Sequence, residues 1–144
     1  MRIARFITCV LVLCGTTWHV AAQNNKEKAK EVGNKALKLE QEGKTDEALS
    51  LLKEAQKLDP ENYIYPYEIA NCYREKKDYK SALKSMEQVM THKDIGPDAY
   101  QMQGNLYDLS GDSVSAINSY ADGLYYFPNA GNLYLELGNL YYIR

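Results

Sequence analysis

Three four-residue stretches that each begin with alanine decide the fold: ALSL at residues 48–51, ALKS at 82–85 and AINS at 116–119. The three alanines lie 34 residues apart, with no insertion between them. A fixed period of this length is typical of supersecondary units that stack on one another and bury apolar surface against their neighbours. Two further sets keep the same spacing: small residues at Ala36, Ala70, Gly104 and Gly138, and larger ones at Leu39, Tyr73, Tyr107 and Tyr141.

The apolar spacing inside each unit predicts two helices joined by a tight turn. In the first unit, Ala29 and Ala36 lie on one side of a helix that is expected to run from residue 24 to Gly43, with residues 23–28 as its N-terminal extension. A second helix follows at once and stops before Pro60. The sequence therefore predicts an all-α solenoid of stacked helical hairpins. Its units are residues 29–62, 63–96 and 97–130, followed by the first helix of a fourth unit at 131–144.

The third unit carries the most complete pattern of small, aromatic and turn residues: Tyr100, Gly104, Tyr107, Gly111, Ala116, Ile117, Tyr120, Gly123 and Pro128. This pattern resembles the tetratricopeptide repeat (TPR), over about three and a half units from Ala29 to Arg144. It departs from the family at Pro66, where an aromatic residue is usual, and at Asp94, where a proline is usual. The resemblance implies a right-handed α-solenoid. It also implies a concave groove, lined by the first helix of each unit, that holds extended peptides or partner helices.

Residues 1–22 have the layout of a secretory signal peptide: a positively charged start, an apolar run from Phe6 to Cys14, and a tail that ends at Ala22. We expect cleavage after Ala22. The apolar run is shorter than the roughly 20 residues that span a bilayer, which disfavours a retained anchor. A lipoprotein is disfavoured because a large residue precedes Cys14. The protein is thus expected to be exported, to the periplasm or cell surface in a bacterium and to the outside otherwise.

The composition argues against several kinds of chemistry. A formal net charge of −2, from 17 basic and 19 acidic residues, gives no sign of a basic surface for nucleic acid. Beyond the leader, Cys72 is the single cysteine and His92 the single histidine, so no disulfide, Cys–His pair or clustered metal site is expected. We therefore expect a protein without enzymatic activity, metal or cofactor.

The phase of the repeat predicts which side chains face the groove. The asparagines at Asn71, Asn105 and Asn139 would form a ladder of amides, each able to donate to and accept from a peptide backbone. The alternative is that these amides only bond a neighbouring helix. The full set of predicted partner-binding residues is Tyr67, Asn71, Arg74, Gln101, Asn105, Asp108 and Asn139.

Some TPR co-chaperones grip a partner's C-terminal carboxylate, and the resemblance to them is limited to the first helix. Lys30 and Asn34 match that clamp. Glu68, Asp98 and Met102 stand where an asparagine and two bases would be needed, and the two acids would repel a carboxylate. We therefore reject a carboxylate clamp.

The C-terminal part is acidic and unusually apolar at its end. Beyond Lys93 the sequence has six acidic residues and one base, Arg144, which favours a basic partner. The last helix is too apolar all round for a terminal surface element. We expect either further repeats after Arg144 or homo-association through this helix.

Two hypotheses of function follow. The first is a non-catalytic scaffold or adaptor of the cell envelope that holds a peptide or partner helix in its groove. The second is the N-terminal docking or sensory region of a longer enzyme or signalling protein. The sequence names neither the partner nor the source.

Overall fold

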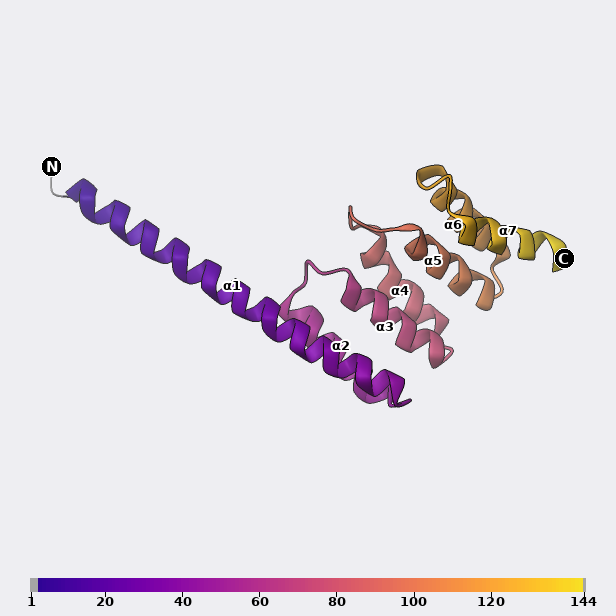
Figure 1. Cartoon of the computed structure of the whole chain (residues 1–144), viewed down its shortest axis with the longest axis horizontal. Coiled ribbons are helices and arrows are strands. Elements are labelled where there is room, and N and C mark those ends of the chain that lie inside the picture. The colour runs from indigo at the N-terminus through magenta and orange to yellow at the C-terminus, as the bar shows by residue number, and fades with distance from the viewer. Residues whose placement is uncertain (1–2, 144) are drawn as a thin grey trace.

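The computed structural model describes the backbone of residues 3–143 and the side chains of residues 21–142. Within these residues the chain forms seven helices and no strand (Figure 1). The predicted all-α fold is confirmed. The helices are α1 (Ile3–Gln41), α2 (Thr45–Leu58), α3 (Ile64–Glu75), α4 (Tyr79–Met90), α5 (Pro97–Leu109), α6 (Ser113–Tyr126) and α7 (Gly131–Ile143).

The helices pair as hairpins, and the hairpins stack. Helix α1 packs against α2, α3 against α4, and α5 against α6. Successive hairpins meet where α2 contacts α3 and where α4 contacts α5, and α7 closes the series on α6 and α5. Figure 1 shows the hairpins following one another in chain order along the stack. First and second helices therefore form two layers, as expected from the repeat.

Helix α1 begins earlier than the sequence predicted. We expected a start near residue 24, but α1 is continuous from Ile3, because residues 23–28 contain neither proline nor glycine to interrupt it. The side chains of residues 21–28 are exposed and the first buried one is Ala29. The predicted leader lies largely outside the residues whose side chains are described. In the described part of the chain, no helix combines the length and apolar content needed to cross a bilayer.

Each hairpin turn is built in the same way. The second residue after each first helix has a positive φ: +74° at Gly43, +58° at Lys77 and +88° at Gly111. The next amide reaches back five residues, with Lys44, Asp78 and Asp112 donating to the carbonyls of Leu39, Tyr73 and Tyr107 over 2.8–2.9 Å. This is the Schellman arrangement that ends a helix on a left-handed residue. Glycine meets the requirement in the first and third turns, and a lysine meets it in the second.

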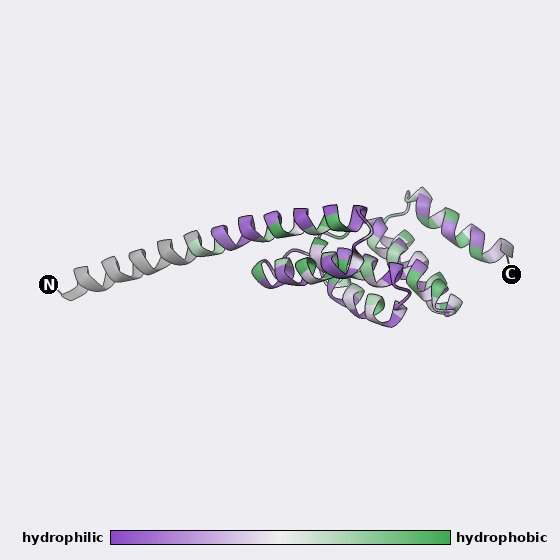
Figure 2. Cartoon of the chain, turned by 90° about the horizontal axis from the view of Figure 1, so that it is seen from below, coloured by the Kyte–Doolittle hydropathy of each residue, from purple (hydrophilic) through white to green (hydrophobic). Residues whose placement is uncertain are grey.

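Alanines in strict register form the crossings within and between hairpins. Ala36, Ala48, Ala70, Ala82 and Ala116 are all 0% exposed. Their small side chains let paired helices approach closely, and larger residues such as Leu52, Met86 and Tyr120 fill the space beside them. Figure 2 shows apolar and polar residues alternating along the helices of the stack, as this one-sided burial requires.

Candidate functional site

The seven predicted groove residues line two adjoining cavities on the layer of first helices. One cavity, of about 380 Å³, lies between α3 and α5 and includes Tyr67, Asn71 and Gln101. The other, of about 370 Å³, lies between α5 and α7 and includes Asp108 and Asn139. Arg74 and Asn105 line both. The structure thus brings all seven side chains together, whereas their role in binding stays a prediction.

Asn71 is already bonded within the protein. Its Nδ2 donates to Glu40 Oε1 on α1 over 2.8 Å, and its Oδ1 accepts from Arg74 Nη2 over 2.6 Å. The amide therefore joins the first two hairpins, which is the alternative that the sequence left open. Arg74 is held in place by the same contact.

The other two amides of the ladder have more freedom. Asn105 Oδ1 accepts a 2.6 Å hydrogen bond from the Tyr120 hydroxyl on α6, which fixes the orientation of the amide. Its Nδ2 has no hydrogen-bond partner in the described part of the chain, and the exposed Asn139 side chain has none there either. Donors at these two positions remain available to a backbone carbonyl of a bound segment.

A chain of polar contacts joins α5 to α7 at the edge of the groove. Gln101 Nε2 donates to Glu136 Oε1 over 2.8 Å. Asn132 Nδ2 donates to Gln101 Oε1 over 2.9 Å and to Asp98 Oδ1 over 3.3 Å. These contacts hold α7 against α5 although the two helices belong to different units. Gln101 therefore has a positioning role in addition to its place in the groove.

The groove is acidic, and the pKa values of one of its carboxylates, Glu68, and of Glu40 on α1 are raised. Burial, and next the Glu40 carboxylate, raise the pKa of Glu68. Burial, followed by the Glu75 carboxylate, raises the pKa of Glu40, although Asn71 donates a hydrogen bond to it. Among the described residues that line the two cavities there are four acids, Glu68, Asp98, Asp108 and Glu136, and one base, Arg74. Such a surface attracts positive charge.

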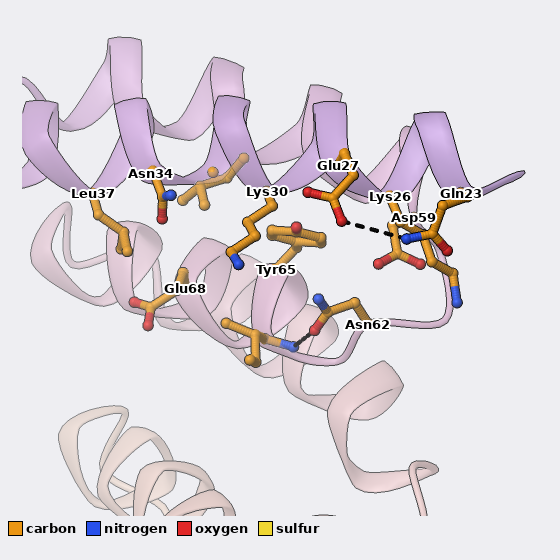
Figure 3. Close-up of a pocket in the computed structure, with 13 residues that line it drawn as sticks. Gln23, Lys26, Glu27, Lys30, Asn34, Leu37, Asp59, Asn62, Tyr65 and Glu68 are labelled. Carbon is orange, nitrogen blue, oxygen red and sulfur yellow. Dashed lines mark hydrogen bonds between the residues drawn. The ribbon is translucent and has the colours of Figure 1, made fainter. Parts of the chain in front are cut away.

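Sequence reasoning did not foresee a third hollow, between α1 and α3, which is shown in Figure 3. Its volume is about 480 Å³ and its apolar walls include Leu37, Leu52, Ile64 and Tyr65. Gly33 makes room for the Tyr65 ring, which forms one wall: a Cβ on Gly33 would lie 2.8 Å from Tyr65 Cε1, so the ring rests against the α1 backbone. The one signal in the sequence that could have pointed to this hollow was Gly33 itself, because the next unit has Tyr67 at the same repeat position.

The same hollow is lined by three of the five residues considered for a carboxylate clamp. Lys30, Asn34 and Glu68 all line it, together with Asp59. Glu68 therefore lies near the two clamp-like residues, as the repulsion argument assumed. Amide, basic and acidic side chains surround an apolar floor. This arrangement suits a side chain better than a free anion.

The residues that the structure describes contain no group of three or more potential ligands placed to hold a metal ion. Cys72 is fully buried, and burial together with Glu40, Glu75 and Glu68 raises the pKa of its thiol to about 12. His92 lies beyond the end of α4, where its ring contacts Tyr63 with centroids 4.8 Å apart and its Nδ1 accepts from the Asp94 amide.

Comparison with solved structures gives the same architecture. The first TPR of Spaghetti (RPAP3), bound to the HSP90 peptide SRMEEVD, is 23% identical with a TM-score of 0.74, covering 82% of this chain and 94% of that one. The Arabidopsis OM64 TPR domain is 18% identical with a TM-score of 0.75, covering 83% and 99%. The N-terminal domain of STI-1 from C. elegans is 17% identical with a TM-score of 0.72, covering 81% and 96%.

At these identities the structural likeness shows the fold. No curated protein matches the sequence. Residues 39–106 match the family model of the tetratricopeptide repeat, and this match spans the first two hairpin turns and most of α5. Together with the stacked hairpins in 34-residue register, the match confirms the predicted tetratricopeptide repeats in this part of the chain.

Proposed function

We propose that this protein is a non-catalytic adaptor of the cell envelope that holds a peptide or a partner helix in its concave groove. The observation that carries the proposal is the convergence of seven polar side chains from α3, α5 and α7 on two adjoining cavities. The Spaghetti domain, which has the same fold, is bound to a peptide. Free donors on Asn105 and Asn139 suit recognition of a main chain.

The partner segment is basic. Four carboxylates against one arginine line the two cavities, and Arg74 is already bonded to Asn71. A lysine or arginine in the groove would therefore meet more opposite charge than like charge. Because the carboxylates lie along an open groove, the attraction would weaken as the salt concentration rises.

Export through a cleaved leader is the second part of the proposal. The layout of residues 1–22 supports it, and the first core residue of α1 is Ala29, so cleavage after Ala22 would remove no side chain that packs in the described core. Intact mass of the protein recovered from its source cells tests this. A chain that starts at Gln23 agrees with export by cleavage, and a chain that keeps residues 1–22 contradicts it.

Capture of partners from an envelope extract tests the groove. The groove variant Asp98→Asn with Glu136→Gln removes two carboxylates that face the cavities. The control Glu87→Gln with Asp122→Asn removes two exposed carboxylates from α4 and α6. We expect the groove variant to lose partners that wild type and control retain. Equal recovery by all three proteins would remove the groove assignment.

A second candidate function is the docking or sensory region of a longer enzyme or signalling protein. It is favoured by the open face of α7, where the side chains of Tyr134 and Tyr141 are 56% and 69% exposed. The equivalent positions of the preceding unit lie on the face of α5 that α6 covers. The second helix of a further unit would cover this face. The reading frame after Arg144 decides: a catalytic or membrane-spanning domain there favours the second candidate, and a stop codon favours the first.

For the chain as it stands, we propose that this face of α7 pairs with a second copy. Tyr134 and Tyr141 flank Gly138, which has no atom within 4 Å of a Cβ position. If two α7 helices pack antiparallel and cross at Gly138, Tyr134 of one copy lies beside Tyr141 of the other. This arrangement has the symmetry of a twofold interface. Light scattering should give a dimer that Tyr141→Glu abolishes. A monomer at every concentration contradicts the pairing.

A further inference from the structure

The hollow between α1 and α3 has the form of a side-chain pocket. Leu37 from α1, Leu52 from α2, and Ile64 and Tyr65 from α3 enclose about 480 Å³. Leu52 and Tyr65 are 1% and 6% exposed and are therefore fixed by the core, whereas Ile64 is 50% exposed at the mouth. This volume lies within the range of about 300–1,000 Å³ that is usual for binding pockets.

The rim of this pocket is polar and carries charges of both signs. Lys26 and Lys30 lie on one side of it, and Glu27, Asp59 and Glu68 complete the ring. In the view of Figure 3, Lys30 lies between Glu68 and Tyr65, over the apolar floor. Among the described residues, neither lysine has an ion-pair partner within 4.0 Å. A neutral apolar side chain can enter without separating an existing ion pair.

The excess of negative charge grows along the groove. Among the described residues, two bases and three acids line the α1–α3 pocket. Beyond this pocket, the described lining adds one base, Arg74, and three acids, Asp98, Asp108 and Glu136. A segment that lies in the groove therefore meets an apolar pocket at one end and an excess of negative charge at the other. Its complement has an apolar side chain at one end and basic side chains at the other.

We propose that the α1–α3 pocket anchors one bulky apolar side chain of an extended partner segment, whose basic side chains lie over the acidic cavity between α5 and α7. The proposal rests on the groove function proposed above and specifies its partner. The pocket selects a side chain and not a C-terminal carboxylate, because Glu68 and Asp59 on its rim repel such a carboxylate.

Fluorescence anisotropy with the purified protein tests the proposal. The probe is a fluorescein-labelled, C-terminally amidated decapeptide with one phenylalanine near one end, three lysines near the other, and glycine and serine elsewhere. It is made in both sequence orders, because the groove does not fix the direction of the segment. We expect replacement of the phenylalanine by alanine to weaken binding about tenfold or more, as burial of an aromatic side chain predicts.

Protein variants locate the effect. Ile64→Gln places a polar group at the pocket mouth and should weaken the phenylalanine peptide about as much as the alanine substitution in the peptide does. Val114→Gln is the matched control, since Val114 also lies in the first turn of its helix and is 72% exposed away from the pocket. Circular dichroism of both variants checks that the helices are retained.

The outcomes separate this proposal from the groove function. If the lysines matter but the phenylalanine and Ile64→Gln do not, the anchor is overturned and the groove function stands. If neither lysines nor phenylalanine improve binding over a glycine–serine peptide, both are overturned. A free-carboxylate probe that binds at least tenfold more tightly than the amidated one would also overturn the anchor, because the site would then capture a chain terminus.

Discussion

Gly104 on α5 and Gly138 on α7 occupy the same position of the 34-residue repeat, but their surroundings are opposite. A Cβ on Gly104 would overlap the ring of Tyr120, whereas a Cβ on Gly138 would have no atom within 4 Å. The difference arises because α6 covers α5, and no helix in the described chain covers that face of α7. One substitution therefore has opposite effects at the two sites.

We expect Gly104→Ala to lower the free energy of unfolding by about 1–3 kcal/mol, because the Tyr120 ring must move within a packed interface. At protein concentrations too low for the proposed dimer, Gly138→Ala should raise it by about 0.5–1 kcal/mol, since alanine is the better residue inside an open helix. Urea unfolding followed by circular dichroism measures both. Loss of stability in both variants would mean that a partner, such as a second copy, covers Gly138.

The turn at Lys77 gives a second prediction. Lys77 has φ = +58° where the equivalent turns have Gly43 and Gly111. A left-handed conformation costs a residue with a Cβ about 1–2 kcal/mol, so Lys77→Gly should raise the free energy of unfolding by about 1 kcal/mol. Lys84→Gly, at an exposed site inside α4, should lower it by about the same amount. Destabilisation by Lys77→Gly would contradict this account of the turn.

The accessibility of Cys72 gives a third prediction. Its thiol is buried and its pKa is raised from 9.0 to about 12, so at pH 8 roughly a thousandfold fewer thiolates form than at an unperturbed site. We expect no reaction with Ellman's reagent until the protein is unfolded. In denaturant, one thiol per chain indicates removal of residues 1–22, and three indicate that Cys9 and Cys14 remain. Fast reaction of Cys72 in the native protein would contradict its burial.

The architecture was predictable because its signals are local and periodic. Alanines in strict register predicted the close crossings, and glycines such as Gly43 predicted the turns. The groove's hydrogen bonds were not predictable in the same way. Asn71 bonds Glu40 from another hairpin and Asn105 bonds Tyr120 from the next helix, and these pairings depend on which long side chains meet in space. The α1–α3 pocket was missed because Gly33, its one signal in the sequence, does not tell which side chain of another helix lies beside it.

Glu68 gives a prediction on pH. Burial and the nearby Glu40 carboxylate raise its pKa above the unfolded value of 4.5, so the folded chain holds a proton that the unfolded chain releases. Stability therefore falls as the pH rises from 4.5 through the raised pKa, because the folded state then carries an unfavourably placed charge. Glu68→Gln removes this charge. It should stabilise the protein at pH 7, and the gain should vanish below pH 4.5, where both states of the wild type are protonated.

Unfolding by urea at several pH values between 4 and 8 measures the effect, with Glu87→Gln on the exposed face of α4 as control. The control should track the wild type throughout. A gain from Glu68→Gln that persists unchanged at pH 4 would show that packing of the amide, and not loss of charge, is responsible. The same variant links stability to the groove. If Glu68 attracts basic segments, Glu68→Gln should weaken binding of the lysine-containing peptide at pH 7 while it stabilises the fold. The groove would then keep this carboxylate at the expense of stability.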